Sequence, residues 1–330
     1  MDVWFFESEA NELGKEIVEE LIAKGIAQDE RANGGPVIVK IDEKLGLTKE
    51  KYRTMVILRS DGTALYSTND LALAKQKFEK YHVDRSIYVV DFRQNLHFQQ
   101  VFKILELWGF KQAAKCYHLS YGYVTLPEGA MSARRGRVAL FKEVFDEAVK
   151  RVLAVESEKS PDLSDSERRR IAEQIGLGAL AYSILGVDNQ KDIVFDMDSA
   201  LSFDGRTGPY IQNAHVRASS ILKKANVSKL DGLGVGSIEY ELTKHEVELV
   251  EQISRLPAVV EQAANEYRPL VMAAYAYELA NAFHSFYHAV PVLQTEEAGT
   301  RTARLHLVSA ARITLATALR LLDIHAPEVM

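Results

Sequence analysis

The chain has 330 residues, of which 47% are hydrophobic, and this length and composition are typical of a globular protein with two domains. Its formal net charge of -6 provides no overall basic field for nucleic acid, so any contact with RNA must be local. The apolar runs are far shorter than the roughly 20 residues of a membrane span, and the first residues lack the pattern of a secretory signal. The single cysteine, Cys116, fits a reducing compartment, so a cytoplasmic location is expected.

The first 125 residues alternate between helical and strand-like patterns. The helical segments carry apolar residues at helical spacing and are residues 11–24, 70–81 and 94–110. The strand-like segments are PVIVKI (36–41), MVILRS (55–60), SIYVVD (86–91), which is of the buried type, and KCYHLSYGYV (115–124). This alternation predicts a partial Rossmann-type α/β fold with a parallel sheet, which binds ligands beyond the carboxyl ends of its strands. Chemistry is therefore expected just after SIYVVD and after KCYHLSYGYV.

Beyond residue 140 the strand patterns end and amphipathic helices dominate. Ser164 and Glu167 form a capping box, which predicts the start of a helix. The later helices are predicted at residues 209–224, 239–255, 269–288 and 300–322. The sequence thus predicts an α/β domain over residues 1–140, a helical connector over 141–200 and an all-α helical bundle over 201–330.

Six separated segments resemble arginyl-tRNA synthetases of class I, in the order in which that family has them. They are LYSTNDLALAKQKFE, YVVDFRQNLHFQQVF, MSARRGRV, FDGRTGPYIQNAHVRASSIL, YAYELANAFHSFYHAVPVL and LRLLDIHAPEVM. The resemblance implies a partial class I catalytic, nucleotide-binding domain with the remnant of an insertion, followed by an anticodon-binding bundle. It also implies an arginine–tRNA ligase, whose partners are L-arginine, tRNA-Arg and ATP with Mg²⁺. No metal site of the protein's own and no membrane contact are expected.

The MSARRG segment resembles the loop with which this family closes over the β- and γ-phosphates of ATP. Such chemistry requires positioned cations that neutralise phosphate charge. The resemblance implies catalytic roles for Met131, Ser132, Arg134 and Arg135, and an ATP contact at Gly136. Many class I enzymes have lysine where Arg135 stands, and a planar guanidinium is not equivalent to an ammonium, so the role of Arg135 stays open. The alternative interpretation of the segment is a solvated basic turn after a strand.

Arginine is best recognised by carboxylate and amide oxygens, because its guanidinium presents a planar fork of donors. Tyr66 and Asp70 lie four residues apart across a predicted strand-to-helix junction, and Gln94 directly follows SIYVVD. The resemblance implies that these three residues bind arginine, with Asp70 as the partner of the guanidinium. For Asp70 the alternative is an acid that complements a helix dipole. The resemblance implies an ATP contact for His97, and a structural histidine is its alternative.

In the helical part, the resemblance implies that Tyr210, Asn213 and Met330 bind tRNA. Single-stranded bases are read by stacking on aromatic rings and by bonds to their polar edges, and Tyr210 could supply such a ring. Family members usually have a second tyrosine where Asn213 stands, and asparagine can hydrogen-bond a base but stacks less well. A core position for Tyr210 and a frayed tail for Met330 are the alternatives. The arginines of the last predicted helix could meet phosphates or form a solvated face; they are Arg301, Arg304, Arg312 and Arg320.

No H-x-G-H motif occurs in the sequence. Class I synthetases use this motif for the ATP phosphates, in the first half of their nucleotide fold. The resemblance therefore implies a fragment that is inactive without a separate amino-terminal half, and its sheet would keep an exposed apolar edge. The alternative is a noncatalytic paralogue that keeps the bundle as a tRNA-binding or regulatory module. Tyr66, Asp70 and Gln94 together argue against it, because a pure RNA binder needs no arginine pocket.

Overall fold

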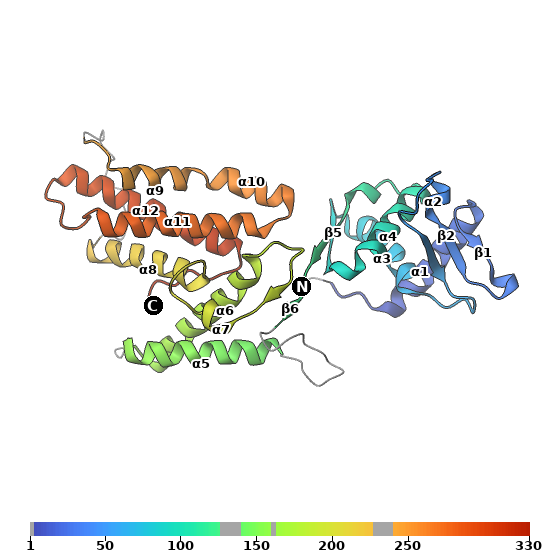
Figure 1. Cartoon of the computed structure of the whole chain (residues 1–330), viewed down its shortest axis with the longest axis horizontal. Coiled ribbons are helices and arrows are strands. Elements are labelled where there is room, and N and C mark those ends of the chain that lie inside the picture. The colour runs from blue at the N-terminus through green and yellow to red at the C-terminus, as the bar shows by residue number, and fades with distance from the viewer. Residues whose placement is uncertain (1–2, 126–139, 160–162, 227–239) are drawn as a thin grey trace. The chain divides into compact units, whose positions relative to one another are not determined.

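The computed structural model of the chain describes residues 3–125, 140–159, 163–226 and 240–330. Contacts within the chain divide it after Gly122 into two compact units. Figure 1 shows that the first unit combines strands with helices, whereas the second is built almost entirely of helices. Among the described residues, no helix is both long enough and apolar enough to cross a membrane.

The first unit contains one antiparallel and one parallel sheet within its described residues. Its helices are α1 (Glu7–Ala23), α2 (Ile41–Lys44), α3 (Tyr66–Tyr81) and α4 (Asn95–Trp108). Its strands are β1 (Gln28–Asp29), β2 (Val37–Lys40), β3 (Thr54–Leu58), β4 (Ser86–Asp91) and β5 (Cys116–Tyr121).

Parallel pairing holds for β4 and β5, in register from Ser86–Cys116 to Asp91–Tyr121. It does not extend to β2, which pairs antiparallel with both β1 and β3. The physical reason lies in the connection from β2 to β3, where the only helix is the single-turn α2. Parallel neighbours require a longer crossover, usually a full helix packed on the sheet, as α4 provides between β4 and β5.

Within the described residues, helices cover one face of the β4–β5 sheet. On the covered face the ring of Tyr88 packs against Phe98 of α4, with their centroids 5.1 Å apart. On the other face Ile87 and Val89 are 43% and 62% exposed. The prediction of a strand buried on both sides is therefore wrong for β4, because the described residues supply helices to only one of its faces. We call the exposed apolar surface the open face of the sheet; it consists of Ile87, Val89, Tyr117 and Tyr121.

The second unit is mainly helical, and its capping box at Ser164 is confirmed, with Ser164 and Glu167 bonding to each other's backbone N–H. Its helices are α5 (Phe141–Lys159), α6 (Asp165–Leu185), α7 (Met197–Ala200), α8 (Gly208–Lys224), α9 (Lys244–Ser254), α10 (Leu256–Glu266), α11 (Pro269–Ala289) and α12 (Ala298–Leu321). Two short strands, β6 (Val124–Thr125) and β7 (Ile193–Val194), pair in parallel.

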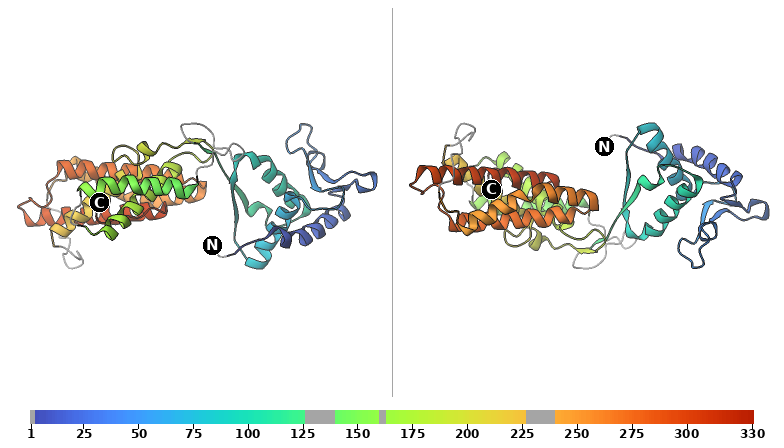
Figure 2. Two further views of the ribbon diagram at one scale, coloured as in Figure 1. Left: turned by 90° about the horizontal axis from the view of Figure 1, so that it is seen from below. Right: turned by 90° about the horizontal axis from the view of Figure 1, so that it is seen from above.

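Helix α11 lies at the centre of the bundle, and α8, α9, α10 and α12 all pack against it. Figure 2 shows the helices α9 to α12, in orange and red, running alongside one another. The side chains of Tyr275, Phe283 and Phe286 on α11 are almost completely buried. The bundle therefore has a closed apolar core, unlike the β4–β5 sheet of the first unit.

Candidate functional sites

Helix α3 begins earlier than the sequence predicted, at Tyr66 rather than at Asp70. The backbone N–H of Leu65 donates to the hydroxyl of Thr68 over 2.9 Å, and the Thr68 hydroxyl itself donates to the Ile57 carbonyl of β3. These bonds close the first turn and anchor it to the antiparallel sheet, which a local pattern does not reveal. The predicted strand-to-helix junction is thus wrong, and Tyr66 and Asp70 lie one turn apart on the same side of α3. Tyr66 is 77% exposed.

Asp70 is bonded to His97, which lies on α4. Nε2 of His97 is 2.6 Å from Oδ2 of Asp70, and the two side chains keep 23% and 21% of their surfaces exposed. Two residues expected to bind different ligands are therefore direct partners. A carboxylate has several acceptor positions on its two oxygens, so a bond from His97 leaves room for a guanidinium on Asp70. The pair can orient the carboxylate while the ligand supplies further donors.

Gln94 is exposed at the end of the 3₁₀ helix Phe92–Gln94, directly after the carboxyl end of β4. Asp91 caps this turn by accepting the backbone N–H of Arg93 over 3.0 Å. Hydrogen bonds from the Arg93 side chain and, less strongly, its backbone hold the pKa of Asp91 below its usual value. The turn places Gln94 three residues before His97 on the segment that leads into α4. The predicted loop residues Met131, Ser132, Arg134, Arg135 and Gly136 lie outside the described residues.

The start of α8 is set by a close approach to α6. A side chain on Gly208 would place its Cβ 2.3 Å from the carbonyl oxygen of Gly178, so only glycine fits there. Thr207 caps the helix by accepting the backbone N–H of Tyr210 over 3.2 Å. The Tyr210 ring packs against Tyr277 and His284, with centroid distances of 5.5 and 4.7 Å. Tyr210 is thus half-buried in the bundle surface rather than extended into solvent.

Asn213 and Met330 line one cavity of about 640 Å³ in the second unit, which we call the first cavity. It lies between α8 and the end of α11, and Arg217, Tyr287 and His288 contribute to its wall. The sequence patterns did not single out Arg217, Tyr287 or His288 as candidate binding residues. The spacing of Arg217, one turn after Asn213 on α8, was the available signal.

The Arg217 guanidinium is held by three rings at this wall. One of its terminal nitrogens lies 3.2 Å from Nδ1 of His284 and 3.4 Å from Nε2 of His288, and its carbon lies 5.0 Å from the Tyr287 ring centre. Burial, reinforced by the Arg217 charge, lowers the pKa of His284 to about 4. His284 is therefore neutral near pH 7, and its Nδ1 can accept from Arg217. The arrangement fixes a cation at the edge of the first cavity.

Comparison with known families decides the identity of the chain. Residues 2–197 match the family described as tRNA synthetases class I (R), catalytic domain, and residues 211–330 match the DALR anticodon binding domain. The chain belongs to the class I arginyl-tRNA synthetase family. The catalytic match continues past Gly122 and includes α5 and α6 of the second unit.

Two relatives of this synthetase chain are named arginine–tRNA ligase. The protein from Bdellovibrio bacteriovorus is 37% identical over 100% of this chain and 55% of its own length, and that from Clostridium perfringens is 36% identical over 100% and 56%. The chain thus spans about half the length of the curated relatives it matches. The Thermus thermophilus arginyl-tRNA synthetase structure is 31% identical and covers 97% of this chain and 58% of its own, with a TM-score of 0.83. The Plasmodium falciparum arginyl-tRNA synthetase, at 20% identity, shares the fold with a TM-score of 0.77 over 97% of this chain and 52% of its own.

Proposed function

We propose that this chain forms part of an arginine–tRNA ligase, which attaches arginine to tRNA-Arg at the expense of ATP. The observation that carries the proposal is the match of the whole chain to proteins named arginine–tRNA ligase, at up to 37% identity. In the proposed reaction the carboxylate of arginine attacks the α-phosphate of ATP and pyrophosphate leaves. A terminal ribose hydroxyl of the tRNA then attacks the carbonyl of the arginyl adenylate, so that the ester to tRNA forms and AMP leaves.

Arginine binding is assigned to Tyr66, Asp70 and Gln94. The half-buried carboxylate of Asp70 meets the guanidinium, since a charge-assisted bond to a positioned carboxylate is stronger than one between neutral groups. His97 holds Asp70 through Nε2, and Nδ1 is the atom through which His97 would contact ATP. The positions of these residues on α3, on α4 and just after β4 support this assignment, because ligands of such folds bind beyond the carboxyl ends of parallel strands.

ATP is assigned to the MSARRG segment. Arg134 and Arg135 would neutralise the β- and γ-phosphates, with Met131 and Ser132 in the same loop and Gly136 allowing close approach of its backbone. Mg²⁺ would be bound through the ATP phosphates, as is usual for this ion. Among the described residues, no group of three or more His, Cys, Asp or Glu side chains could hold a metal ion.

The tRNA is assigned to the bundle, with an unpaired base of the anticodon loop in the first cavity. Asn213 and Arg217 present polar groups to such a base, Tyr287 presents its ring, and Met330 borders the same cavity. Tyr210 helps to position His284 at this wall, because Nε2 of His284 donates to the Tyr210 carbonyl over 3.4 Å. We assign catalysis to residues 1–140, a connecting role to residues 141–200 and anticodon binding to residues 201–330.

We further propose that activity requires a separate amino-terminal half. Two observations support this: the sequence has no H-x-G-H motif, and the open face exposes Ile87, Val89, Tyr117 and Tyr121. Burial of this apolar face against further strands or helices of a catalytic domain would stabilise the assembly.

Arginine-dependent exchange of pyrophosphate into ATP tests both proposals. The chain is assayed alone and after mixing with a separately produced amino-terminal half, and Asp70→Ala serves as the matched control in which arginine binding is weakened. Exchange only on mixing is the expected result. Exchange by the chain alone would refute the need for a second half. Binding of tRNA without exchange in any mixture would refute the ligase and favour a noncatalytic tRNA-binding paralogue.

A further inference from the structure

A second cavity of about 680 Å³ adjoins the first in the bundle. The two cavities share Val216, Ser220 and Met330 as wall residues. The second cavity lies between α8 and α12, and its charged wall residues are Lys223, Arg312 and Glu328. Neither the family comparison nor the proposed anticodon contacts assign it a ligand.

The polar atoms of this second cavity are incompletely bonded. Nε of Arg312 and the hydroxyl oxygen of Ser219 are both buried, and neither has a hydrogen-bond partner among the described residues. A terminal nitrogen of Arg312 lies 3.8 Å from Glu328, which is an ion pair but too long for a hydrogen bond. Buried donors without acceptors are costly, so such groups in a native protein call for an explanation, of which a bound ion or water is one.

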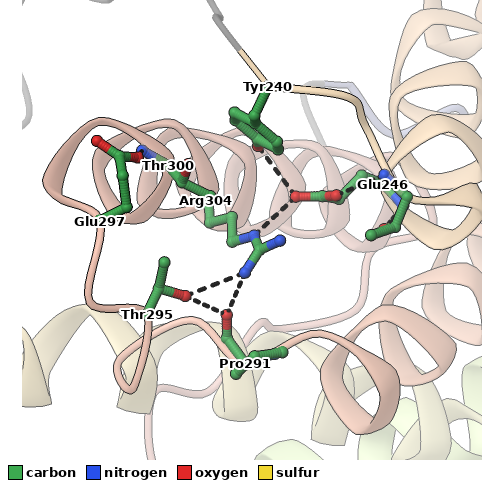
Figure 3. A network of polar contacts seen from close by, with 8 residues as sticks. Tyr240, Glu246, Pro291, Thr295, Glu297, Thr300 and Arg304 are labelled. Carbon is green, nitrogen blue, oxygen red and sulfur yellow. Dashed lines mark hydrogen bonds and ion pairs between the residues drawn. The ribbon is translucent and has the colours of Figure 1, made fainter.

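The arginines of α12 differ in whether they are available to a ligand. Figure 3 shows that Arg304 already has partners: Nε donates to Glu246 over 2.8 Å, and one terminal nitrogen donates to the Pro291 carbonyl over 2.9 Å. Arg301 and Arg320 are exposed and are not among the residues that line either cavity. Arg312 combines a cavity position with spare donors. Among the four arginines predicted to form a basic face, Arg312 is therefore the one suited to bind a ligand.

We infer that Arg312, together with Lys223 and Ser219, binds a backbone phosphate of the RNA strand whose base occupies the first cavity. This inference rests on the proposed function in tRNA binding. An arginine fork, an ammonium and a hydroxyl are all donors, which is the chemistry that a phosphate diester requires. A base and its own phosphate are neighbours in an RNA strand, as the two cavities are neighbours in the bundle.

Glu328 opposes the phosphate in this arrangement. Its carboxylate competes for Arg312 in the free protein and repels an incoming phosphate, so RNA must displace it. A purely structural Arg312–Glu328 ion pair would behave differently. Removal of either partner would then leave RNA affinity unchanged or lower it. A phosphate site instead predicts that loss of Arg312 lowers RNA affinity and loss of Glu328 raises it.

The test measures binding of tRNA to the full chain by fluorescence anisotropy over a range of salt concentrations. We expect Arg312→Gln to weaken binding about tenfold and to reduce the salt slope by about 0.7, the value for one phosphate on a single strand. Arg320→Gln is the matched control, with the same charge change at an exposed position of α12, and its effect stays below about twofold. Glu328→Gln tightens binding about two- to threefold.

Three outcomes are decisive. If wild-type chain does not bind tRNA, the proposed function in tRNA binding fails and the phosphate site fails with it. If wild-type chain binds but Arg312→Gln and Arg320→Gln behave alike, the phosphate site alone is overturned. If Arg312→Gln lowers the thermal midpoint of the bundle, Glu328→Gln decides, because tighter binding supports the site and unchanged or weaker binding overturns it.

Discussion

The two units of the chain differ in how they complete their apolar surfaces. In the first unit the β4–β5 sheet is covered on one face, and Val89 on the other remains 62% exposed. In the second unit α11 is surrounded by other helices, and Phe283 and Phe286 are fully buried. The comparison indicates that the anticodon-binding bundle is a complete packing unit, whereas the catalytic unit presents a surface suited to further association.

The same difference appears in the two units' carboxylate pairs. Asp70 and His97 keep about a fifth of their side-chain surfaces exposed, so a ligand can still reach the carboxylate. Glu246 and Arg304 are 0% and 11% exposed, and the carboxylate also accepts from Tyr240 and from the backbone of Thr243. The carboxylate of the first pair is thus accessible to a ligand, whereas that of the second pair is enclosed.

The largest expected effect in this comparison comes from breaking the buried pair. Arg304→Met leaves the Glu246 carboxylate buried without its cation, which costs about 3–5 kcal/mol and lowers the thermal midpoint of the bundle by roughly 10 °C. Far-UV circular dichroism reports mainly the second unit, which holds most of the described helical residues. Fluorescence of Trp4 and Trp108 reports the first unit alone, because the chain has two tryptophans and both lie there. We expect the dichroism midpoint to fall and the fluorescence midpoint to stay.

Arg301→Met, at an exposed position of the same helix, is the control and should leave both midpoints unchanged. Adding Glu246→Gln to Arg304→Met should recover part of the loss, since the uncompensated charge is removed while an amide oxygen can still accept from Thr243. Burial alone would raise the pKa of Glu246, but bonds from Thr243, Arg304 and Tyr240 together lower it. The stabilisation is thus present above the unfolded-state pKa and is lost as the pH falls through the lower folded-state value. A fall in both midpoints together would show that the two units do not unfold independently.

The next effect tests the first unit as a binding site. In the assembled enzyme, Asp70→Ala should raise the KM for arginine by about 30- to 150-fold, the equivalent of about 2–3 kcal/mol for a charged hydrogen bond. The KM for ATP should change little, and pyrophosphate exchange measures both constants. Glu79→Gln removes an exposed carboxylate from the same helix and should change neither. Equal losses for arginine and ATP would reassign Asp70 to a structural role in holding α3 and α4 together.

Local patterns predicted those parts of the structure that local interactions determine. The capping box of Ser164 and Glu167, and α11 over Pro269–Ala289, follow from residues within a few positions of one another. The early start of α3 was missed because it depends on the bond from Thr68 to the Ile57 carbonyl, eleven residues away. The geometry of the candidate sites was even harder to predict from the sequence. The Arg217–His284 contact joins residues 67 positions apart, and no periodicity encodes such a meeting.

The last expected effect is a pH response of the bundle at His284. The pKa of this residue is lowered to about 4, so between about pH 4 and the usual value of 6.5 the unfolded chain binds more protons at this position than the folded one. His284 therefore stabilises the fold least in acid, and its contribution rises with pH by at most about 1.4 kcal/mol per unit before it levels off above the usual value. Urea unfolding followed by circular dichroism between pH 4 and 7 measures the slope.

His284→Asn keeps an amide oxygen that can accept a hydrogen bond from Arg217. The variant should reduce the slope of the unfolding free energy with pH by up to about 1.4 kcal/mol per pH unit, the contribution of one proton. Burial also lowers the pKa of His215, so part of the slope should persist in the variant. His325→Gln, at an exposed position, is the matched control and should leave the slope as it is. An unchanged slope in His284→Asn would mean that the imidazole is not held neutral by burial. The Arg217 guanidinium would then lack its fixed acceptor, and the first cavity would be less ordered than the closed core beneath it.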